Sequence, residues 1–247
     1  MSAITLAGIT FACVSGGALL GMFLPGHHLS TDDKDVVRLG TGLIGTIAAL
    51  VLGLLIASAK SSYDTQSTQV THMTSNIVLL DNLLAEYGPE TNELRNLLRR
   101  GVAVLADRMW RENSSDVAKV VPFEASDASD AFFAKLQQLS PQNDSQRSLQ
   151  ARAIQIATDI AQTRLLLFAQ RNNSIPMPFL VVLIFWLTII FGSFGLFAKP
   201  SATVFGSLFV FALSAAGAIY LVLELGQPFS GLMQLSSAPL RRVLVPL

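Results

Sequence analysis

Four stretches of this sequence stay apolar for the length of a membrane-spanning helix, and this feature limits the possible folds more than any other. A helix needs about 20 apolar residues to cross the hydrocarbon core of a bilayer. Continuous apolar runs also exclude a transmembrane β-barrel, whose strands alternate between apolar and polar residues. We therefore predict four spans, at Ala3–Leu24, Leu39–Ala59, Phe179–Phe197 and Thr203–Leu223.

The composition agrees with a chain that contacts a lipid bilayer. Hydrophobic residues make up 51% of the chain and charged residues 14%, against about 25% charged residues in soluble domains. The net charge is zero, so the basic surface that nucleic-acid binding requires is absent. The one cysteine, Cys13, lies within an apolar run and has no second cysteine for an intramolecular disulfide.

Most of the charged residues lie between the second and third spans, in residues 60–177. Apolar residues recur there at intervals of three and four, which predicts amphipathic helices. Two such apolar stripes, at Val70–Tyr87 and Leu94–Met109, are separated by the Gly and Pro of "YGPE". The first of these helices runs on from span two. A short helix at Ala131–Leu139 and a long one capped by Asp144 or Ser145 follow. The predicted fold class is all-α, with four transmembrane helices and a cytoplasmic helical bundle inserted between spans two and three.

The orientation is predicted from basic residues near the span ends, which are more frequent in the cytoplasm. Residues 60–177 and both termini share one side, whose basic residues are Lys60, Arg164, Arg171, Arg241 and Arg242. The other side has Lys34, Arg38 and Lys199. We therefore expect a multi-pass protein of the inner (plasma) membrane with cytoplasmic termini. Its parts are a transmembrane hairpin (1–59), a cytoplasmic helical domain (60–177), a second hairpin (178–224) and an interfacial C-terminal segment (225–247).

Small residues recur along one face of span two. Gly42, Thr46, Ala49 and Gly53 follow one another at intervals of four, three and four. Such a face either lets another helix approach closely or lines a narrow pathway, and the spacing fits both interpretations. In the second case Thr41, Thr46 and Ser58 would replace part of an ion's hydration shell.

A carboxylate, Glu224, stands where the last span ends. It either lies at headgroup level or is buried with a partner, because a bare carboxylate in hydrocarbon is costly. Gly226, Pro228 and Gly231 then predict a sharp turn. Beyond it we expect an apolar face that lies along the membrane, with Arg241 and Arg242 at anionic headgroups. That face comprises Phe229, Leu232, Met233 and Leu235.

No enzymatic motif occurs in the chain. His27 and His28 precede several aspartates in "GHHLSTDDKD" (Gly26–Asp35). Adjacent histidines in a short loop are more often solvated than metal-bound, since the spacing specifies no ligand geometry. Neither a zinc-protease, nucleophile-elbow nor phosphate-loop pattern is found. We expect a protein that is not an enzyme and that has neither a cofactor nor a metal.

Two stretches carry a resemblance to a known family. "ELGQPFSGLMQLSSAPL" (Glu224–Leu240) resembles the C-terminal signature of the bestrophin-like membrane proteins, and "LDNLLAEYGPETNELRNLLRRGV" (Leu80–Val102) is similar to their first cytoplasmic helix pair. The most specific residues are Glu224, Pro228, Phe229, Ser230 and Gly231. Gly226 and Gln227 stand where the family usually has an acidic and a basic residue, so a charge pair at that turn is lost.

The resemblance implies kinship with bestrophins, which are pentameric anion channels with four spans per subunit. We therefore predict a homo-oligomeric, channel-like protein, pentameric by resemblance, with inorganic ions as its cargo and span two lining the path. Span two has no Phe and so lacks the aromatic pore neck of true bestrophins. The alternative is a non-conducting membrane scaffold or sensor that signals through its cytoplasmic bundle.

Overall fold

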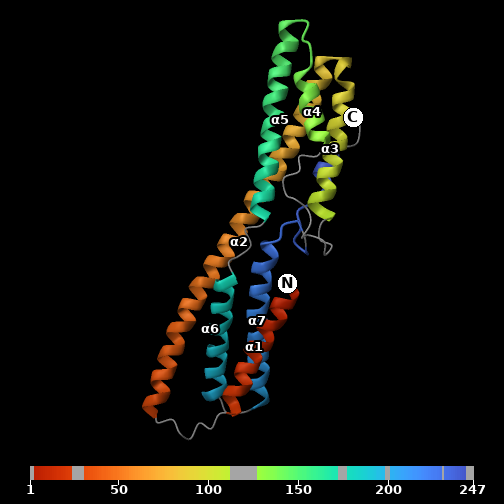
Figure 1. Ribbon diagram of the computed structural model, residues 1–247. Helices are drawn as coiled ribbons and strands as arrows, with labels where there is room; N and C mark the ends of the chain where they lie inside the picture. Colours follow the sequence, from red (N-terminus) through yellow and green to blue (C-terminus); the bar gives the residue numbers. More distant parts are fainter. Residues whose placement is uncertain are drawn as a thin grey trace. The chain divides into compact units, whose positions relative to one another are not determined.

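The computed structural model describes residues 3–23, 31–111, 127–171, 177–197, 201–229 and 231–242, and these contain helices and no strand. The predicted all-α class is therefore confirmed. Figure 1 shows the elements, which are α1 (Ala3–Phe23), α2 (Thr31–Tyr87), η2 (Pro89–Thr91), α3 (Asn92–Arg111), α4 (Asp127–Gln137), α5 (Asp144–Arg171), α6 (Met177–Phe197), α7 (Ala202–Leu225) and α8 (Ala238–Arg242).

The chain divides into two compact units. The first consists of Met1–Tyr63 and Ser174–Gly226, and the second of Asp64–Asn173 and Gln227–Leu247. Helix α2 contributes its first part to one unit and its last part to the other. The C-terminal residues therefore belong with the helical bundle of the second unit.

The first unit holds the helices that can cross a membrane. Four helices of the described chain are long and apolar enough to do so, and they are α1, α2, α6 and α7. The candidate region on α2 is 53 residues long, far more than the roughly 20 that a bilayer requires. Only part of α2 is therefore needed for the crossing, and its most apolar part is the predicted span Leu39–Ala59.

Glycines bring α1 and α6 of the first unit into close contact. A Cβ atom on Gly17 would lie 2.8 Å from the carbonyl oxygen of Thr188, and one on Gly192 would lie 3.4 Å from the carbonyl oxygen of Gly17. A Cβ on Gly195 would collide with the backbone of Ala18. Small residues allow helix backbones to approach in this way within a membrane. Gly17, Gly192 and Gly195 therefore serve close packing of α1 against α6.

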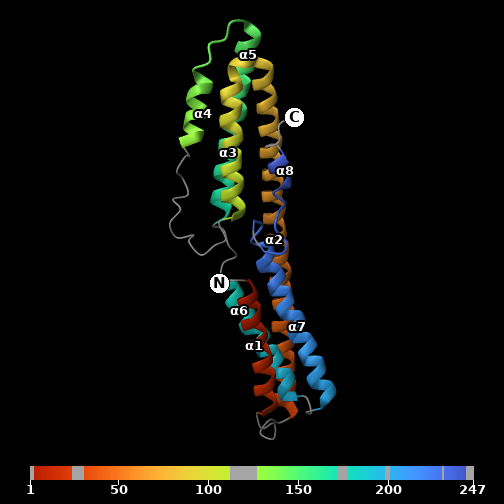
Figure 2. The ribbon, with the colours of Figure 1, turned by 90° about the vertical axis from the view of Figure 1, so that its right-hand side faces the viewer.

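The second unit is a helical bundle whose apolar stripes follow the predicted periodicity. In Figure 2, α3 and α5 run alongside the upper part of α2. The shared core is formed by Leu80, Leu84, Leu94, Phe132, Leu136, Ala153, Ile156 and Ala157, all of which are buried. Between α2 and α3, Gly88 adopts φ 137° and ψ 179°, a backbone region that is almost exclusive to glycine.

The starts of two predicted helices are wrong. The short helix predicted at Ala131–Leu139 is α4, which begins earlier, at Asp127, and the cap of the long helix is one residue earlier than predicted. The side-chain oxygen of Asn143 accepts a 2.8 Å hydrogen bond from the backbone N–H of Gln146, which is the bond that defines an N-cap. The predicted caps, Asp144 and Ser145, are instead the first residues of α5. The sequence offered three suitable capping residues in succession, and the first of them takes this role.

Candidate functional site

A cavity of about 590 Å³ lies between α2 and α6 in the first unit. Helix α2 contributes Arg38, Thr41, Gly42 and Gly45 to its wall, and α6 contributes Ile190, Ser193, Phe194 and Phe197. The two α2 glycines keep the space open because they have no side chain to fill it. Thr41 and Gly42, predicted from the sequence as pathway or packing residues, therefore lie at a real cavity.

Arg38 supplies the positive charge of this cavity. Its guanidinium carbon lies 5.4 Å from the ring centroid of Phe197, within the range of a cation–π interaction. Its Nη1 atom is also 3.8 Å from Oδ1 of Asp35, and both side chains are 64% exposed. Such an exposed pair is weak, so the cation remains able to attract an anion toward the cavity.

The hydroxyl groups at the cavity and along α2 are partly committed to their own helices. Thr46 Oγ1 donates a 3.0 Å hydrogen bond to the carbonyl oxygen of Gly42. Ser193 Oγ donates in the same way to the carbonyl oxygen of Ile190, at 2.8 Å. A hydroxyl group that donates its proton to a backbone carbonyl oxygen still has lone pairs that can accept a hydrogen bond. Toward a pathway these two groups therefore present acceptors, which suit water or a cation.

The small-residue face of α2 is exposed among the residues that the structure describes. Its residues Gly42, Thr46, Ala49 and Gly53 are all exposed, as is Ser58, which was predicted separately as a pathway residue. A Cβ atom built on Gly42 or on Gly53 would meet nothing within 4 Å among the described residues. The close helix packing inside the first unit uses the α1 and α6 glycines instead. The α2 face is thus available to another molecule or to a pathway.

The C-terminal motif begins with a buried carboxylate. Glu224 is 4% exposed and lies in the last turn of α7, which extends to Leu225. Its neighbours Val222 and Leu225 pack with Ala59 of α2, and Tyr220, one turn earlier, interacts with the carboxylate. Of the two predicted environments for Glu224, exposure at headgroup level is therefore excluded.

The turn after Glu224 uses only one of the two predicted glycines. Gly226 has φ −72°, an ordinary right-handed conformation, so its conformational freedom is not needed. Gly231 has φ 86° and requires a residue that tolerates positive φ. Ser230 lies outside the described residues.

The residues beyond the turn pack against α3 of the same unit. The Phe229 ring meets the Trp110 ring edge-to-face, with centroids 5.5 Å apart. The Trp110 indole N–H donates a 2.7 Å hydrogen bond to the carbonyl oxygen of Leu235. Phe229 and Leu235 are each 8% exposed, whereas Leu232 is 85% exposed. The single apolar face that we predicted is therefore wrong, because two of its members are buried against protein.

Sequence reasoning missed the α6 side of the cavity and the role of Trp110. Ser193, Phe194 and Phe197 lie within a uniformly apolar span, whose pattern does not indicate which side faces α2. Trp110 is a lone tryptophan at the end of a stripe, and its partner Leu235 is 125 positions away. His27 and His28, which we expected to be solvated rather than metal-bound, lie outside the described residues. Among the described residues no group of three His, Cys, Asp or Glu is arranged to hold a metal.

The fold and the apolar helices define the class of this protein. It is an all-helical membrane protein with four helices that can span the bilayer, linked to a helical bundle. The family model of the Bestrophin-like domain matches residues 8–240, so the chain belongs to the bestrophin-like family. Comparisons with curated proteins and with solved structures found no match.

Proposed function

We propose that this protein forms a homo-oligomeric, channel-like assembly in the cell inner membrane and passes inorganic ions along a path lined by α2. The observation that carries this proposal is the exposed small-residue face of α2. Family membership supports it, since the bestrophin resemblance implies channels built from several identical subunits. In this proposal the passage of ions is passive and runs between identical subunits.

The contrast between the two exposed sides of α2 supports an intermolecular role. Leu39, Leu43, Leu50 and Leu54 are 64–76% exposed and suit contact with lipid chains. Glycine, threonine and alanine on the other face offer little surface to lipid, and they are the residues that membrane helices use for close approach. A second copy of the chain, or water at the centre of several copies, accounts for this face better than lipid does.

The Arg38 cavity supports a role in ion entry. It joins one end of the small-residue face through Thr41 and Gly42, and Arg38 gives it a positive potential. Beyond this point Thr46 offers acceptor lone pairs. The path thus begins with a charge that concentrates anions and continues with groups that coordinate water or cations.

Substitution of Gly53 tests the proposal. Gly53 and Gly206 are both exposed, and a Cβ atom on either meets nothing within 4 Å among the described residues. Only Gly53 lies on the small-residue face of α2. We expect Gly53→Leu to reduce the oligomer seen by native mass spectrometry and the ion flux into proteoliposomes, while Gly206→Leu preserves both. Equal effects of the two substitutions would refute the assignment of this face.

The alternative is a non-conducting scaffold or sensor. One specific observation favours it, namely a small cavity inside the helical bundle of the second unit. The same experiment separates the two functions. An oligomer that depends on Gly53 but supports no flux in wild-type proteoliposomes, with any inorganic cation or anion supplied, indicates the scaffold or sensor.

A further inference from the structure

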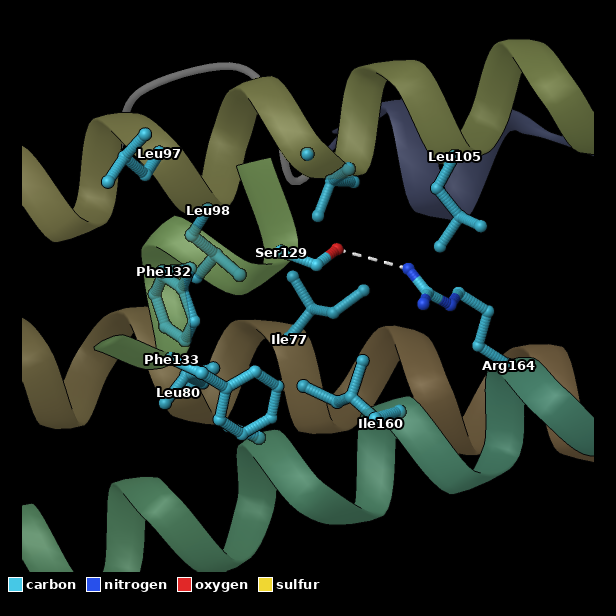
Figure 3. A pocket seen from close by; sticks show the side chains of 14 residues that line it. Ile77, Leu80, Leu97, Leu98, Leu105, Ser129, Phe132, Phe133, Ile160 and Arg164 are labelled. Atoms are coloured by element: carbon cyan, nitrogen blue, oxygen red, sulfur yellow. Dashed lines mark hydrogen bonds between the residues drawn. The ribbon is translucent and has the colours of Figure 1, made fainter. Parts of the chain in front are cut away.

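The helical bundle contains a cavity of about 90 Å³ that combines an apolar wall with one cation. Figure 3 shows that Arg164 of α5 reaches toward Ser129 of α4, while Leu98, Ile77 and Ile160 project into the same space. Arg164 Nη1 donates a 3.1 Å hydrogen bond to Ser129 Oγ. These residues come from four helices of the second unit, so the cavity belongs to that unit alone.

Arg164 occupies an unfavourable environment. Its side chain is half-buried, and burial lowers the pKa of the guanidinium, with repulsion from Arg108 as the next cause and a smaller opposing attraction from Asp130. No ion pair joins Arg164 to a carboxylate among the side chains that the structure describes. Burial of a guanidinium costs free energy that an anionic partner in the cavity would offset.

Gly101 provides an independent sign that this space is kept open. It lies in the interior of α3 and lines the cavity. A glycine inside a helix costs about 0.5–1 kcal/mol relative to alanine. A Cβ atom at Gly101 would meet nothing within 4 Å among the described residues, so close packing does not explain the absence of a side chain. Access to the cavity does explain it.

We propose that this cavity binds a small aliphatic monocarboxylate, whose carboxylate pairs with Arg164 and whose hydrocarbon chain packs among Ile77, Leu98 and Ile160. A guanidinium matches two carboxylate oxygens with parallel N–H donors. Apart from Ser129 and Arg164 the wall is apolar, so a phosphate would lack donors for its remaining oxygens. The size also limits the ligand, because a cavity of about 150 Å³ holds one benzene molecule.

Binding of butanoate to the detergent-purified full-length protein tests this assignment. Isothermal titration calorimetry and the melting temperature are measured with butanoate and with butan-1-ol, which has a similar chain but no charge. We expect saturable binding of butanoate, a higher melting temperature in its presence, and an affinity for butan-1-ol at least tenfold lower. Absence of butanoate binding, or equal binding of the alcohol, would overturn the proposal.

Substitutions locate the site. Arg164→Leu should weaken butanoate binding by about tenfold or more, and it should not lower the melting temperature without ligand, because the cost of burying a cation is removed. Arg152→Leu, at an exposed position of the same helix, should leave the affinity unchanged. Gly101→Leu should abolish binding by filling the cavity, whereas Ala134→Leu, at an exposed position of α4, should not. Wild-type affinity in both Arg164→Leu and Gly101→Leu would contradict the site.

Discussion

The indole N–H of Trp110 donates a 2.7 Å hydrogen bond to the carbonyl oxygen of Leu235, and this bond ties the C-terminal segment to α3. The attachment is reinforced by the contact between the Trp110 and Phe229 rings. A further hydrogen bond of 2.7 Å, from the Leu235 N–H to the Pro228 carbonyl oxygen, closes the turn. Two residues of the family motif, Pro228 and Phe229, therefore help to anchor the chain end to the helical bundle.

Trp110→Phe should loosen this attachment. The substitution keeps an aromatic ring against Phe229 but leaves the Leu235 carbonyl without its donor, which costs about 1–3 kcal/mol. Amide hydrogen exchange should then accelerate by about tenfold or more in the segment after Pro228. Trp186→Phe on α6 is the matched control and should leave exchange in that segment unchanged. Unaltered exchange in Trp110→Phe would show that the hydrogen bond does not hold the segment.

Gly88 and Gly101 should respond in opposite ways to alanine. Gly88 has φ 137°, where a side chain costs about 1–3 kcal/mol, so Gly88→Ala should lower the stability of the bundle. Gly101→Ala should raise it by about 0.5–1 kcal/mol, because this glycine lies inside a helix and faces open space. The melting temperatures of the purified variants provide the test. A shift in the same direction for both would contradict the assigned backbone roles.

Asp81 joins α2 to α3 and should be sensitive to neutralisation. Arg95 donates to both its oxygens, from Nε at 2.9 Å and from Nη2 at 2.7 Å, and Arg99 Nη2 lies 3.5 Å away. Asp81→Asn leaves Arg95 with a mismatched partner in a mostly buried setting, which costs about 1–3 kcal/mol. Asp144→Asn removes an ion pair to Arg147 at an almost fully exposed carboxylate, and should cost less than about 1 kcal/mol. A smaller effect at Asp81 than at Asp144 in thermal unfolding would contradict this ranking.

The helices of both units could be predicted from the sequence, whereas several of the contacts between them could not. A helix that buries one face has apolar residues at intervals of three and four, as Ile77, Leu80 and Leu84 do. This spacing involves residues that are close in the sequence, so it can be recognised without a structure. The bond between Arg164 and Ser129 joins positions 35 residues apart. It depends on how α4 and α5 dock, which no local pattern encodes.

For two patterns found in the sequence, the α2 stripe and Glu224, the sequence alone left the interpretation open. The α2 stripe was visible because glycine and threonine repeat at helical spacing, yet spacing does not say whether the partner is another helix of the same chain. In the structure Gly42, Thr46, Ala49 and Gly53 are exposed among the described residues. For Glu224 the sequence allowed two environments, because the end of an apolar run can be buried in protein or exposed at headgroup level. Only the packing of α7 on α2 decides between them.

The predicted cytoplasmic position of residues 60–177 can be tested by labelling cysteines in intact cells. Cys13 is the only cysteine of the chain and is exposed, so it is first replaced by alanine. Asn143→Cys is exposed at the start of α5 and should resist a membrane-impermeant thiol reagent. Ala202→Cys, exposed at the start of α7, should be labelled because it lies across the bilayer in the predicted topology. The reverse pattern would invert the orientation.

Glu224→Gln tests whether the buried carboxylate is a structural partner. The shape of the side chain is kept, but one acceptor oxygen becomes a donor, and the group is only 4% exposed. A mispaired buried amide costs about 1–3 kcal/mol, so we expect a lower melting temperature for the detergent-purified protein. Glu86→Gln makes the same chemical change at an exposed position and should shift the melting temperature by much less. Equal melting temperatures for the two variants would show that an amide can replace the carboxylate of Glu224. The charge of Glu224 would then stabilise neither α7 nor the turn that follows.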